Sequence, residues 1–180
     1  LKEAAIRRIP QVTDIDIFKK DCKKPIISVT GTNGKTTIVS MLEHVLCRSG
    51  LKAIACGNNG IPPLSINTDL YDYVILELSS YQLEYMCNFN SYISLLANID
   101  QDHLERHENM FDYLNIKLKI FKLCKYSIIN KSLMDDYDNK IEVDNKYLYG
   151  LANSNALINN KIINEITYDS KTLYFKNKFD

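Results

Sequence analysis

The sequence predicts an α/β fold: a mostly parallel, P-loop-type sheet with helices on both faces, followed by an antiparallel, β-rich C-terminal portion. Two observations lead to this class. From residue 25 to about residue 130, short apolar runs alternate with segments of helical periodicity, which is typical of parallel strands joined by crossover helices. From about residue 132, Asn, Asp, Lys and Tyr dominate and only short β-prone pieces recur, a pattern that favours hairpins.

The bulk composition indicates a globular chain without a strongly charged partner. Of the 180 residues 46% are apolar, and 22 Lys and Arg balance 22 Asp and Glu. This neutrality argues against nucleic acid or an anionic membrane held by bulk charge. No apolar run reaches the ~18–20 residues of a membrane span, and no secretory signal pattern is present. Five widely spaced cysteines without a C-x-x-C pair favour reduced thiols over a zinc site. We therefore expect a cytoplasmic protein. We also expect a monomer, although none of these observations bears on oligomeric state.

The first strand and the helix after it give the clearest signals. Residues 26–30 are an apolar run, and a helix is expected at about 35–49, where apolar residues repeat at helical spacing. These residues are Ile38, Met41, Leu42, Val45 and Leu46. Gly50 supplies the helix stop.

The remaining elements give weaker signals. Further strands are expected at 52–56, 73–78, 92–97 and 126–129, a helix at about 109–124, and β-prone hairpin pieces at 146–149, 162–168 and 172–176. Residues 1–24 are charged and weakly periodic. They are expected to form a short helix, a linker or the tail of a preceding domain.

The segment Thr-Gly-Thr-Asn-Gly-Lys-Thr-Thr at 30–37 has the architecture of a phosphate-binding loop. Glycines allow a tight turn whose N–H groups point at phosphate oxygens, and the helix N-terminus behind it adds partial positive charge. Lys35 is expected to reach the terminal phosphates of a nucleotide, and the Thr36 hydroxyl to ligate Mg²⁺. The pattern G-x-x-x-x-G-K-[ST] is not met, because Val29 stands where its first glycine would be. The residues predicted to bind nucleotide are Gly31, Thr32, Asn33, Gly34, Lys35, Thr36 and Thr37.

Three further polar residues lie at or after the ends of predicted strands, at the edge where open parallel sheets bind ligands. Glu77 suits a Mg²⁺-binding acid, although a strand-end carboxylate in solvent is the alternative. His103 is a candidate for a metal ligand or a phosphate contact, or else a surface histidine. Asn58 is placed to contact a ligand, although its Gly-Asn-Asn-Gly segment is also simply a good turn.

Lys117 lies at the edge of the apolar arc of the helix expected at 109–124, close on a helical wheel to Met110 and Phe121. Spacing alone favours a lysine whose methylene stem follows the core boundary while its ammonium stays in water.

Together these segments resemble the Mur ligases, the ATP-dependent amide-forming enzymes of bacterial peptidoglycan synthesis. The loop is followed in order by Gly-Asn-Asn-Gly-Ile-Pro (57–62), Leu-Glu-Leu-Ser-Ser-Tyr-Gln-Leu-Glu (76–84), Asn-Ile-Asp-Gln-Asp-His-Leu-Glu-Arg-His (98–107) and Ile-Lys-Leu-Lys-Ile-Phe (116–121). The loop is shared across the family and is close to that of folylpolyglutamate synthases. The blocks at 76–84 and 98–107 are more specific, and they favour the member that adds D-glutamate.

The resemblance covers about residues 10–180 and implies a domain organisation and a reaction. Residues 25–180 would form most of a central ATP-binding domain and residues 1–24 the tail of an N-terminal domain. The C-terminal domain would be absent, so this chain alone is expected to be inactive. The implied reaction joins UDP-N-acetylmuramoyl-L-alanine and D-glutamate by an amide bond, through an acyl phosphate made with ATP, in the bacterial cytoplasm.

Matched by position, the resemblance also implies residue roles. Lys35 and the loop would hold the ATP phosphates, and Thr36 with Glu77 would bind one Mg²⁺. His103 would bind a second Mg²⁺. Lys117 matches a lysine that the family carries as a carbamate, which would turn an ammonium into an anionic metal ligand beside two cations. The residues implied to face the substrate are Asn58, Ser79 and Gln82.

Two positions depart from the family pattern: Asn59 stands for an aliphatic residue and Glu105 for an aspartate. These departures bear on substrate details more than on the reaction. Another Mur ligase or a folylpolyglutamate-synthase-like ligase remains an alternative. A non-catalytic nucleotide-binding module is an alternative of another class, in which the loop suffices and His103 and Lys117 are dispensable.

Overall fold

The computed structural model describes residues 6–7, 12–87, 89–100, 109–137, 141, 143, 145–149, 151–152, 155–158 and 161–163. Its centre is a six-stranded sheet in which every neighbouring pair of strands is parallel. The strands are β1 (Ile26–Thr30), β2 (Ala53–Gly57), β3 (Tyr73–Glu77), β4 (Ser91–Leu96), β5 (Cys124–Asn130) and β6 (Lys146–Tyr149). Their spatial order is β2-β3-β1-β4-β5-β6, so β1 lies in the interior between β3 and β4.

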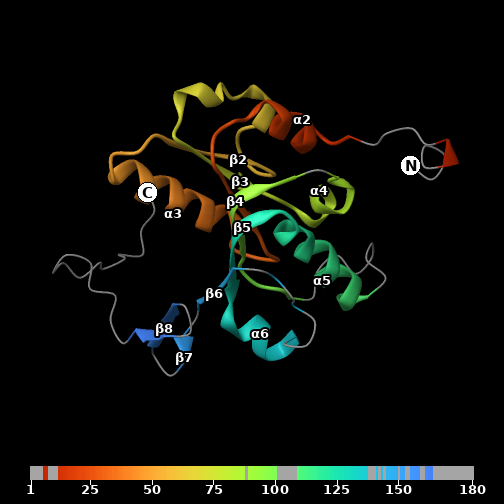
Figure 1. The fold of residues 1–180 in the computed structure, drawn as a ribbon, viewed down its shortest axis with the longest axis vertical. Helices are drawn as coiled ribbons and strands as arrows, with labels where there is room; N and C mark the ends of the chain where they lie inside the picture. The colour runs from red at the N-terminus through yellow and green to blue at the C-terminus, as the bar shows by residue number, and fades with distance from the viewer. Residues whose placement is uncertain are drawn as a thin grey trace.

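Helices cover both faces of this sheet. The α-helices are α2 (Asp14–Asp21), α3 (Lys35–Arg48), α4 (Ser80–Tyr85), α5 (Met110–Leu118) and α6 (Lys131–Tyr137), and short 3₁₀ helices span Pro63–Ser65, Thr68–Leu70 and Lys119–Phe121. Figure 1 shows α3 on one side of the sheet and α4 and α5 on the other. The predicted α/β class, with a mostly parallel sheet and helices on both faces, is confirmed. No helix in the described part of the chain is long and apolar enough to cross a membrane.

The sheet separates two apolar clusters. Beneath α3, Val39 packs in a cluster with Ile27 and Val29 of β1. The larger cluster on the opposite face includes Ile26 of β1 and Leu114 of α5. Successive strand side chains point to opposite faces, which is why all five residues of β1 are buried. This burial is what a central parallel strand requires.

The C-terminal part differs from the prediction in one respect. The segment 146–149, predicted as part of an antiparallel hairpin, joins the main sheet as β6, parallel to β5. The reason is α6, which the sequence pattern did not predict and which supplies the crossover that parallel pairing needs. An antiparallel sheet does follow, made of β7 (Leu151–Ala152), β8 (Asn155–Ile158) and β9 (Lys161–Ile163). The hairpin pieces predicted beyond residue 163 lie outside the described residues.

The helix predicted at 109–124 is also shorter than expected. It ends as α5 at Leu118, continues as a 3₁₀ helix to Phe121, and gives way to β5 at Cys124. Cys124 is already paired with Ser91 of β4. The sheet therefore overrides the helical periodicity at this point.

Helix α2 is part of the core and not a free linker. Its side chains Ile15 and Phe18 are 0% and 4% exposed, and both belong to the larger apolar cluster. The helix starts with a capping box: the Thr13 hydroxyl accepts a hydrogen bond from the Asp16 N–H at 3.1 Å, and the Thr13 N–H donates to the Asp16 carboxylate at 3.0 Å. The division of the chain into domains at residues 24 and 25 stays a prediction.

Replacing Phe18 tests whether α2 is anchored in the core. Phe18→Ala is expected to lower the free energy of unfolding by about 3–5 kcal/mol, because it removes a large buried side chain and leaves a cavity. The matched control on the same helix is Ile17→Ala. Ile17 is 46% exposed, so its loss should change stability by less than about 1 kcal/mol. Urea unfolding measures both. Equal losses of stability in Phe18→Ala and Ile17→Ala would contradict the anchoring of α2 in the core.

Candidate functional site

The candidate site lies at the carboxyl edge of the sheet, around β1. The chain leaves β1 for the edge strand β2, returns to β3, and then crosses to β4 on the other side of β1. Ligands of open α/β sheets bind at such a reversal of strand order. The loop after β1, Glu77 at the end of β3 and the residues after β4 therefore meet at one place.

The loop after β1 turns directly into α3. Gly34 precedes the helix with a φ of 76°, in the left-handed region that glycine adopts without strain. No side chain caps α3, and the first N–H groups of a helix have no acceptors within the helix. Those N–H groups and the helix dipole favour an anion there. The Lys35 ammonium lies over the loop, because Nζ donates to the carbonyl oxygens of Gly31 at 2.9 Å and Thr32 at 2.8 Å.

Glu77 is a buried carboxylate across from this loop. It is 2% exposed, and both of its carboxylate oxygens are held. The Thr36 hydroxyl donates to Oε2 at 3.0 Å, and the Asn58 side-chain amide donates to Oε1 at 3.3 Å. The Asn59 amide donates to the Thr36 hydroxyl oxygen at 3.2 Å. The alternative of a strand-end carboxylate in solvent is therefore wrong.

The Gly-Asn-Asn-Gly turn wraps around the backbone of Glu77. The Asn58 N–H donates to the Glu77 carbonyl at 2.9 Å, and the Gly57 N–H donates to the Ile61 carbonyl at 3.0 Å. A Cβ on Gly57 would overlap the Glu77 carbonyl oxygen, and the φ of Gly57 is 122°. Only glycine fits this close approach. The segment is thus a tight turn that also fixes Asn58 against the carboxylate.

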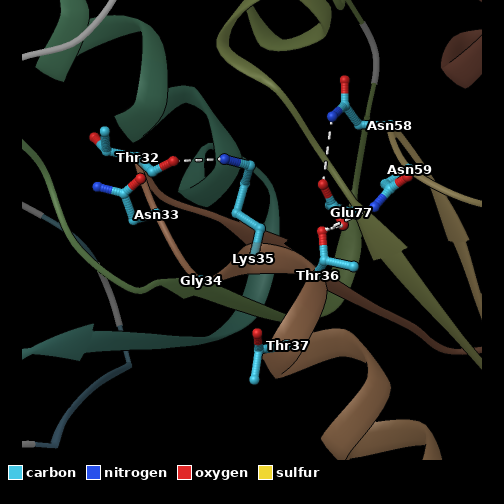
Figure 2. Close-up of a pocket in the computed structure, with 9 residues that line it drawn as sticks. All are labelled: Thr32, Asn33, Gly34, Lys35, Thr36, Thr37, Asn58, Asn59 and Glu77. Atoms are coloured by element: carbon cyan, nitrogen blue, oxygen red, sulfur yellow. Dashed lines mark hydrogen bonds between the residues drawn. The ribbon is translucent and has the colours of Figure 1, made fainter.

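These residues line a cavity of about 440 Å³. The lining residues are Thr32, Asn33, Gly34, Lys35, Thr36, Thr37, Asn58, Asn59 and Glu77. In Figure 2 Lys35 and Thr32 lie on one side, Glu77 with Asn58 and Asn59 on the other, and Thr36 is directed at Glu77. One wall therefore suits an anion and the other suits a cation.

The cation wall offers oxygen donors, the Thr36 hydroxyl and the Glu77 carboxylate. Oxygen ligands suit Mg²⁺, which completes its shell with waters and substrate phosphates. Among the described residues, no group of three or more His, Cys, Asp or Glu side chains could hold a metal ion. The two oxygen donors that the structure describes, one hydroxyl and one carboxylate, suit a Mg²⁺ that also binds a phosphate.

Cys56 lies next to this wall, immediately before Gly57. Burial, with smaller contributions from Cys22 and Glu43, raises the pKa of its thiol to about 12. The thiol is therefore neutral at pH 7, which disfavours it as a nucleophile. None of the five cysteines forms a disulfide.

Lys117 is buried at the back of the loop. It is 1% exposed, and Nζ donates to the Gly31 carbonyl at 2.7 Å and to the Thr30 hydroxyl at 3.3 Å. Nζ also lies 5.1 Å from the centre of the Tyr113 ring. The interpretation that its ammonium stays in water is wrong, because α5 directs this side chain toward the loop.

Two other predicted substrate residues serve the chain locally. The Ser79 hydroxyl accepts from the Gln82 N–H at 3.3 Å, and the Gln82 side-chain oxygen accepts from the Ser79 N–H at 3.0 Å. This is the capping box of α4, and neither residue lines the cavity. The S-x-x-Q spacing signalled this helix, and the sequence analysis missed it. His103 lies outside the described residues.

Two residues without a predicted role contact the loop. The side-chain oxygen of Asn98 accepts from the N–H groups of Thr32 and Asn33, both at 2.9 Å. The Tyr113 hydroxyl lies 3.2 Å from the Thr32 hydroxyl. A signal existed for Asn98, which directly follows a predicted strand at the carboxyl edge. Helical periodicity could place Tyr113 on a buried face but not against the loop.

Comparison with known proteins identifies the family. The Mur ligase middle domain matches residues 29–179. The UDP-N-acetylmuramoylalanine–D-glutamate ligase of Buchnera aphidicola subsp. Acyrthosiphon pisum is 41% identical over 133 residues, which are 73% of this chain and 30% of that protein. The enzyme of the same name from Pasteurella multocida is 38% identical over 130 residues, 72% of this chain and 30% of its own length. The chain thus spans about 30% of these curated relatives.

Solved structures share the fold. A UDP-N-acetylmuramoyl-L-alanyl-D-glutamate–2,6-diaminopimelate ligase aligns with a TM-score of 0.57 at 22% identity, over 79% of this chain and 36% of that one. The MurF ligase of Thermotoga maritima in complex with ADP aligns with a TM-score of 0.54 at 18% identity, over 80% and 41% of the two chains.

Two substitutions at Lys117 separate the effect of its buried charge on the free energy of unfolding from the effect of its side-chain volume. Lys117→Met is expected to keep the free energy of unfolding within about 1 kcal/mol of the wild type or to raise it, because it removes a buried ammonium at similar volume. Two of its acceptors keep another partner, since the Gly31 carbonyl still accepts from Lys35 and the Thr30 hydroxyl still donates to the Leu78 carbonyl at 2.8 Å. Lys117→Ala should lower stability by about 2–4 kcal/mol through the cavity that it leaves. Urea unfolding decides, and a loss above about 3 kcal/mol for Lys117→Met would contradict this account.

Proposed function

Since this chain belongs to the Mur ligase family, we propose that it is the nucleotide-binding part of an ATP-dependent ligase that adds D-glutamate to UDP-N-acetylmuramoyl-L-alanine. The observation that carries the proposal is the pairing of Thr36 with the buried Glu77 carboxylate at 3.0 Å, beside the Lys35 loop. A phosphate-binding wall and a cation-binding wall within one cavity are what a Mg²⁺–nucleotide complex needs. The names of the curated relatives support the choice of acceptor.

The loop and Lys35 would hold the ATP phosphates. The N–H groups at the start of α3 supply neutral donors, and Lys35 supplies a mobile cation. Lys35 Nζ now bonds to two loop carbonyls, and it would exchange these for phosphate oxygens. An ammonium exchanges carbonyl for phosphate readily, because the new hydrogen bonds are charge-assisted at both ends.

Thr36 and Glu77 would bind one Mg²⁺. When bound, this ion neutralises phosphate charge and orients the γ-phosphate for attack. Asn58 and Thr36 fix the two oxygens of Glu77 in advance, so little reorganisation is needed when the nucleotide arrives. We assign a second Mg²⁺ to His103 and to Lys117 as its carbamate, from the family pattern alone.

The carbamate proposal has a physical rationale. The Lys117 ammonium is buried against neutral oxygens of the loop, in a position where a second cation nearby would be repelled. Carbamylation joins CO₂ to the neutral amine with loss of a proton, and it converts the cation into an anion. The modified nitrogen would keep one N–H, enough to donate to the Gly31 carbonyl, while the added carboxylate oxygens would supply the anionic metal ligands.

The reaction would then proceed in two steps. The alanyl carboxylate attacks the γ-phosphorus of ATP, giving an acyl phosphate and ADP. The amine of D-glutamate attacks the acyl carbon, phosphate leaves with its bonding electron pair, and the amine loses a proton as the amide forms. Two anions must meet in the first step, so charge neutralisation and alignment are the main tasks of Lys35 and the loop.

Substrate contacts and cellular setting complete the proposal. Asn58 would face the nucleotide-sugar substrate from the cavity wall, and Ser79 and Gln82 would face it only if the α4 capping box leaves donors exposed. We further propose a bacterial, cytoplasmic, monomeric enzyme with no nucleic-acid or membrane partner. The other domains of such a ligase would supply the remaining contacts.

Acceptor selection tests the proposed function directly. In the intact protein, phosphate release from ATP in the presence of UDP-N-acetylmuramoyl-L-alanine is expected with D-glutamate, and not with L-glutamate or a diamino acid. Phosphate release with another acceptor would indicate a different ligase of the same family, with the same fold and chemistry. Hydrolysis of ATP that ignores both substrates would contradict the ligase proposal.

Removing the loop lysine tests the nucleotide site. Lys35→Ala is expected to weaken MgATP binding by about 10- to 100-fold, because it removes charge-assisted hydrogen bonds to the phosphates. Lys52→Ala is the matched control. Lys52 is exposed and directly precedes β2, so it lies at the amino ends of the strands, away from the site at their carboxyl ends. Isothermal titration calorimetry measures both affinities. If Lys35→Ala binds MgATP within twofold of the wild type, the loop does not bind the ATP phosphates as proposed.

A further inference from the structure

Asn98 connects the end of β4 to the loop after β1. Its side-chain oxygen accepts from the N–H groups of Thr32 and Asn33, both at 2.9 Å, and its side-chain nitrogen donates to the Asn33 carbonyl at 2.9 Å. The backbone carbonyl of Asn98 also accepts from the Thr32 N–H, at 3.1 Å. One side chain thus pairs with both the donors and the acceptor of the loop backbone.

The chemistry of this contact is specific to a short carboxamide. An amide offers an acceptor and a donor on one planar group, which matches the N–H and C=O of a peptide unit. Aspartate in the same place would keep the acceptor, lose the donor to Asn33 and add a negative charge. Alanine would leave the N–H groups of Thr32 and Asn33 without the amide oxygen as acceptor.

Packing brings the loop close enough for this pairing. A Cβ on Gly31 would lie 3.1 Å from the Ala97 Cβ and 3.3 Å from the Asn98 side-chain oxygen. The φ of Gly31 is not positive, so a glycine is needed here for space and not for its backbone conformation. The loop can therefore lie directly against the end of β4.

The pairing divides the donors of the loop into two groups. The N–H groups of Thr32 and Asn33 are engaged by Asn98 and point at β4. The N–H groups from Gly34 onward, at the uncapped start of α3, are those that suit phosphate. The first half of the loop is therefore a fixed support, and the second half is the binding surface.

We infer that Asn98 is a positioning residue for the phosphate loop, which it holds in the nucleotide-binding conformation before the ligand arrives. This inference rests on the proposed nucleotide site and adds a residue to it. A preorganised loop loses less conformational entropy when phosphate binds. Loss of the amide should therefore weaken nucleotide binding even though Asn98 contributes no group to the cavity lining.

The test compares variants of the intact protein by calorimetric titration with MgADP and by urea unfolding. Asn98→Ala is expected to weaken MgADP binding about 5- to 30-fold, which corresponds to the loss of one or two net hydrogen bonds. Asn98→Asp is expected to weaken it as well, because a carboxylate cannot donate to the Asn33 carbonyl and so loosens the loop. Asn98→Asp nearly preserves shape, so it decides the matter if Asn98→Ala does not fold.

Asn130→Ala is the matched control. Asn130 ends β5, the neighbour of β4, and its side-chain oxygen accepts from the Ser132 N–H at 3.1 Å. It lies at a strand end as Asn98 does, and it bonds Ser132 and Tyr149, but it has no described contact with the loop. Asn130→Ala should therefore lower stability about as much as Asn98→Ala while its MgADP affinity stays within twofold of the wild type.

The outcomes are distinct. A wild type that does not bind MgADP would overturn the proposed function itself. A wild type that binds, with both Asn98 variants within twofold of it, would overturn the positioning role and leave the proposed function standing. Equal losses of affinity in Asn98→Ala and Asn130→Ala would also overturn it, because the effect would then follow stability alone.

Discussion

The interior position of β1, between β3 and β4, is the constraint on which the rest of the site depends. Parallel pairing aligns the three strands so that Val29 of β1 lies beside Glu77 of β3 and Leu95 of β4. The loop that follows β1 therefore opens between an acid on one side and the Asn98 amide on the other. A phosphate loop on an edge strand would have only one of these neighbours.

Polar burial at this edge has a cost that the local hydrogen bonds offset. Glu77 and Lys117 are both almost fully buried, and a buried charge opposes folding unless its oxygens or protons are bonded. The carboxylate is bonded by Thr36 and Asn58, and the ammonium by loop oxygens. Apolar residues would stabilise these positions more simply. Their retention as charges is typical of a site that trades stability for function.

Sequence reasoning succeeded where a signal is local and failed where it depends on neighbouring elements. The loop at 30–37 and the strand at 26–30 carry their own glycine and apolar signals, and both lie where predicted. The burial of Lys117 could not be predicted, because helical spacing gives an angle but not the element that the side chain meets. The segment 146–149 carries a strand signal, but its direction depends on α6, whose apolar face is too short to show clear periodicity. Asn98 stood in a recognised block, yet its partner lies more than sixty residues earlier in the chain, which spacing cannot reveal.

The arrangement of two lysines on one carbonyl suggests how the loop releases Lys35 to a nucleotide. Lys35 and Lys117 both donate to the Gly31 oxygen, at 2.9 Å and 2.7 Å. As long as Lys117 is unmodified, two ammonium groups share this one acceptor and repel each other, by roughly 3 kcal/mol at ~5 Å and an effective dielectric constant of ~20. Lys117 is buried and held by α5, whereas Lys35 is half-buried at the mouth of the cavity, so Lys35 is the one free to move. A phosphate in the cavity would draw Lys35 away from Gly31 and relieve that repulsion. The same pair of lysines that holds the loop together thus lowers the cost of its transition to the bound state.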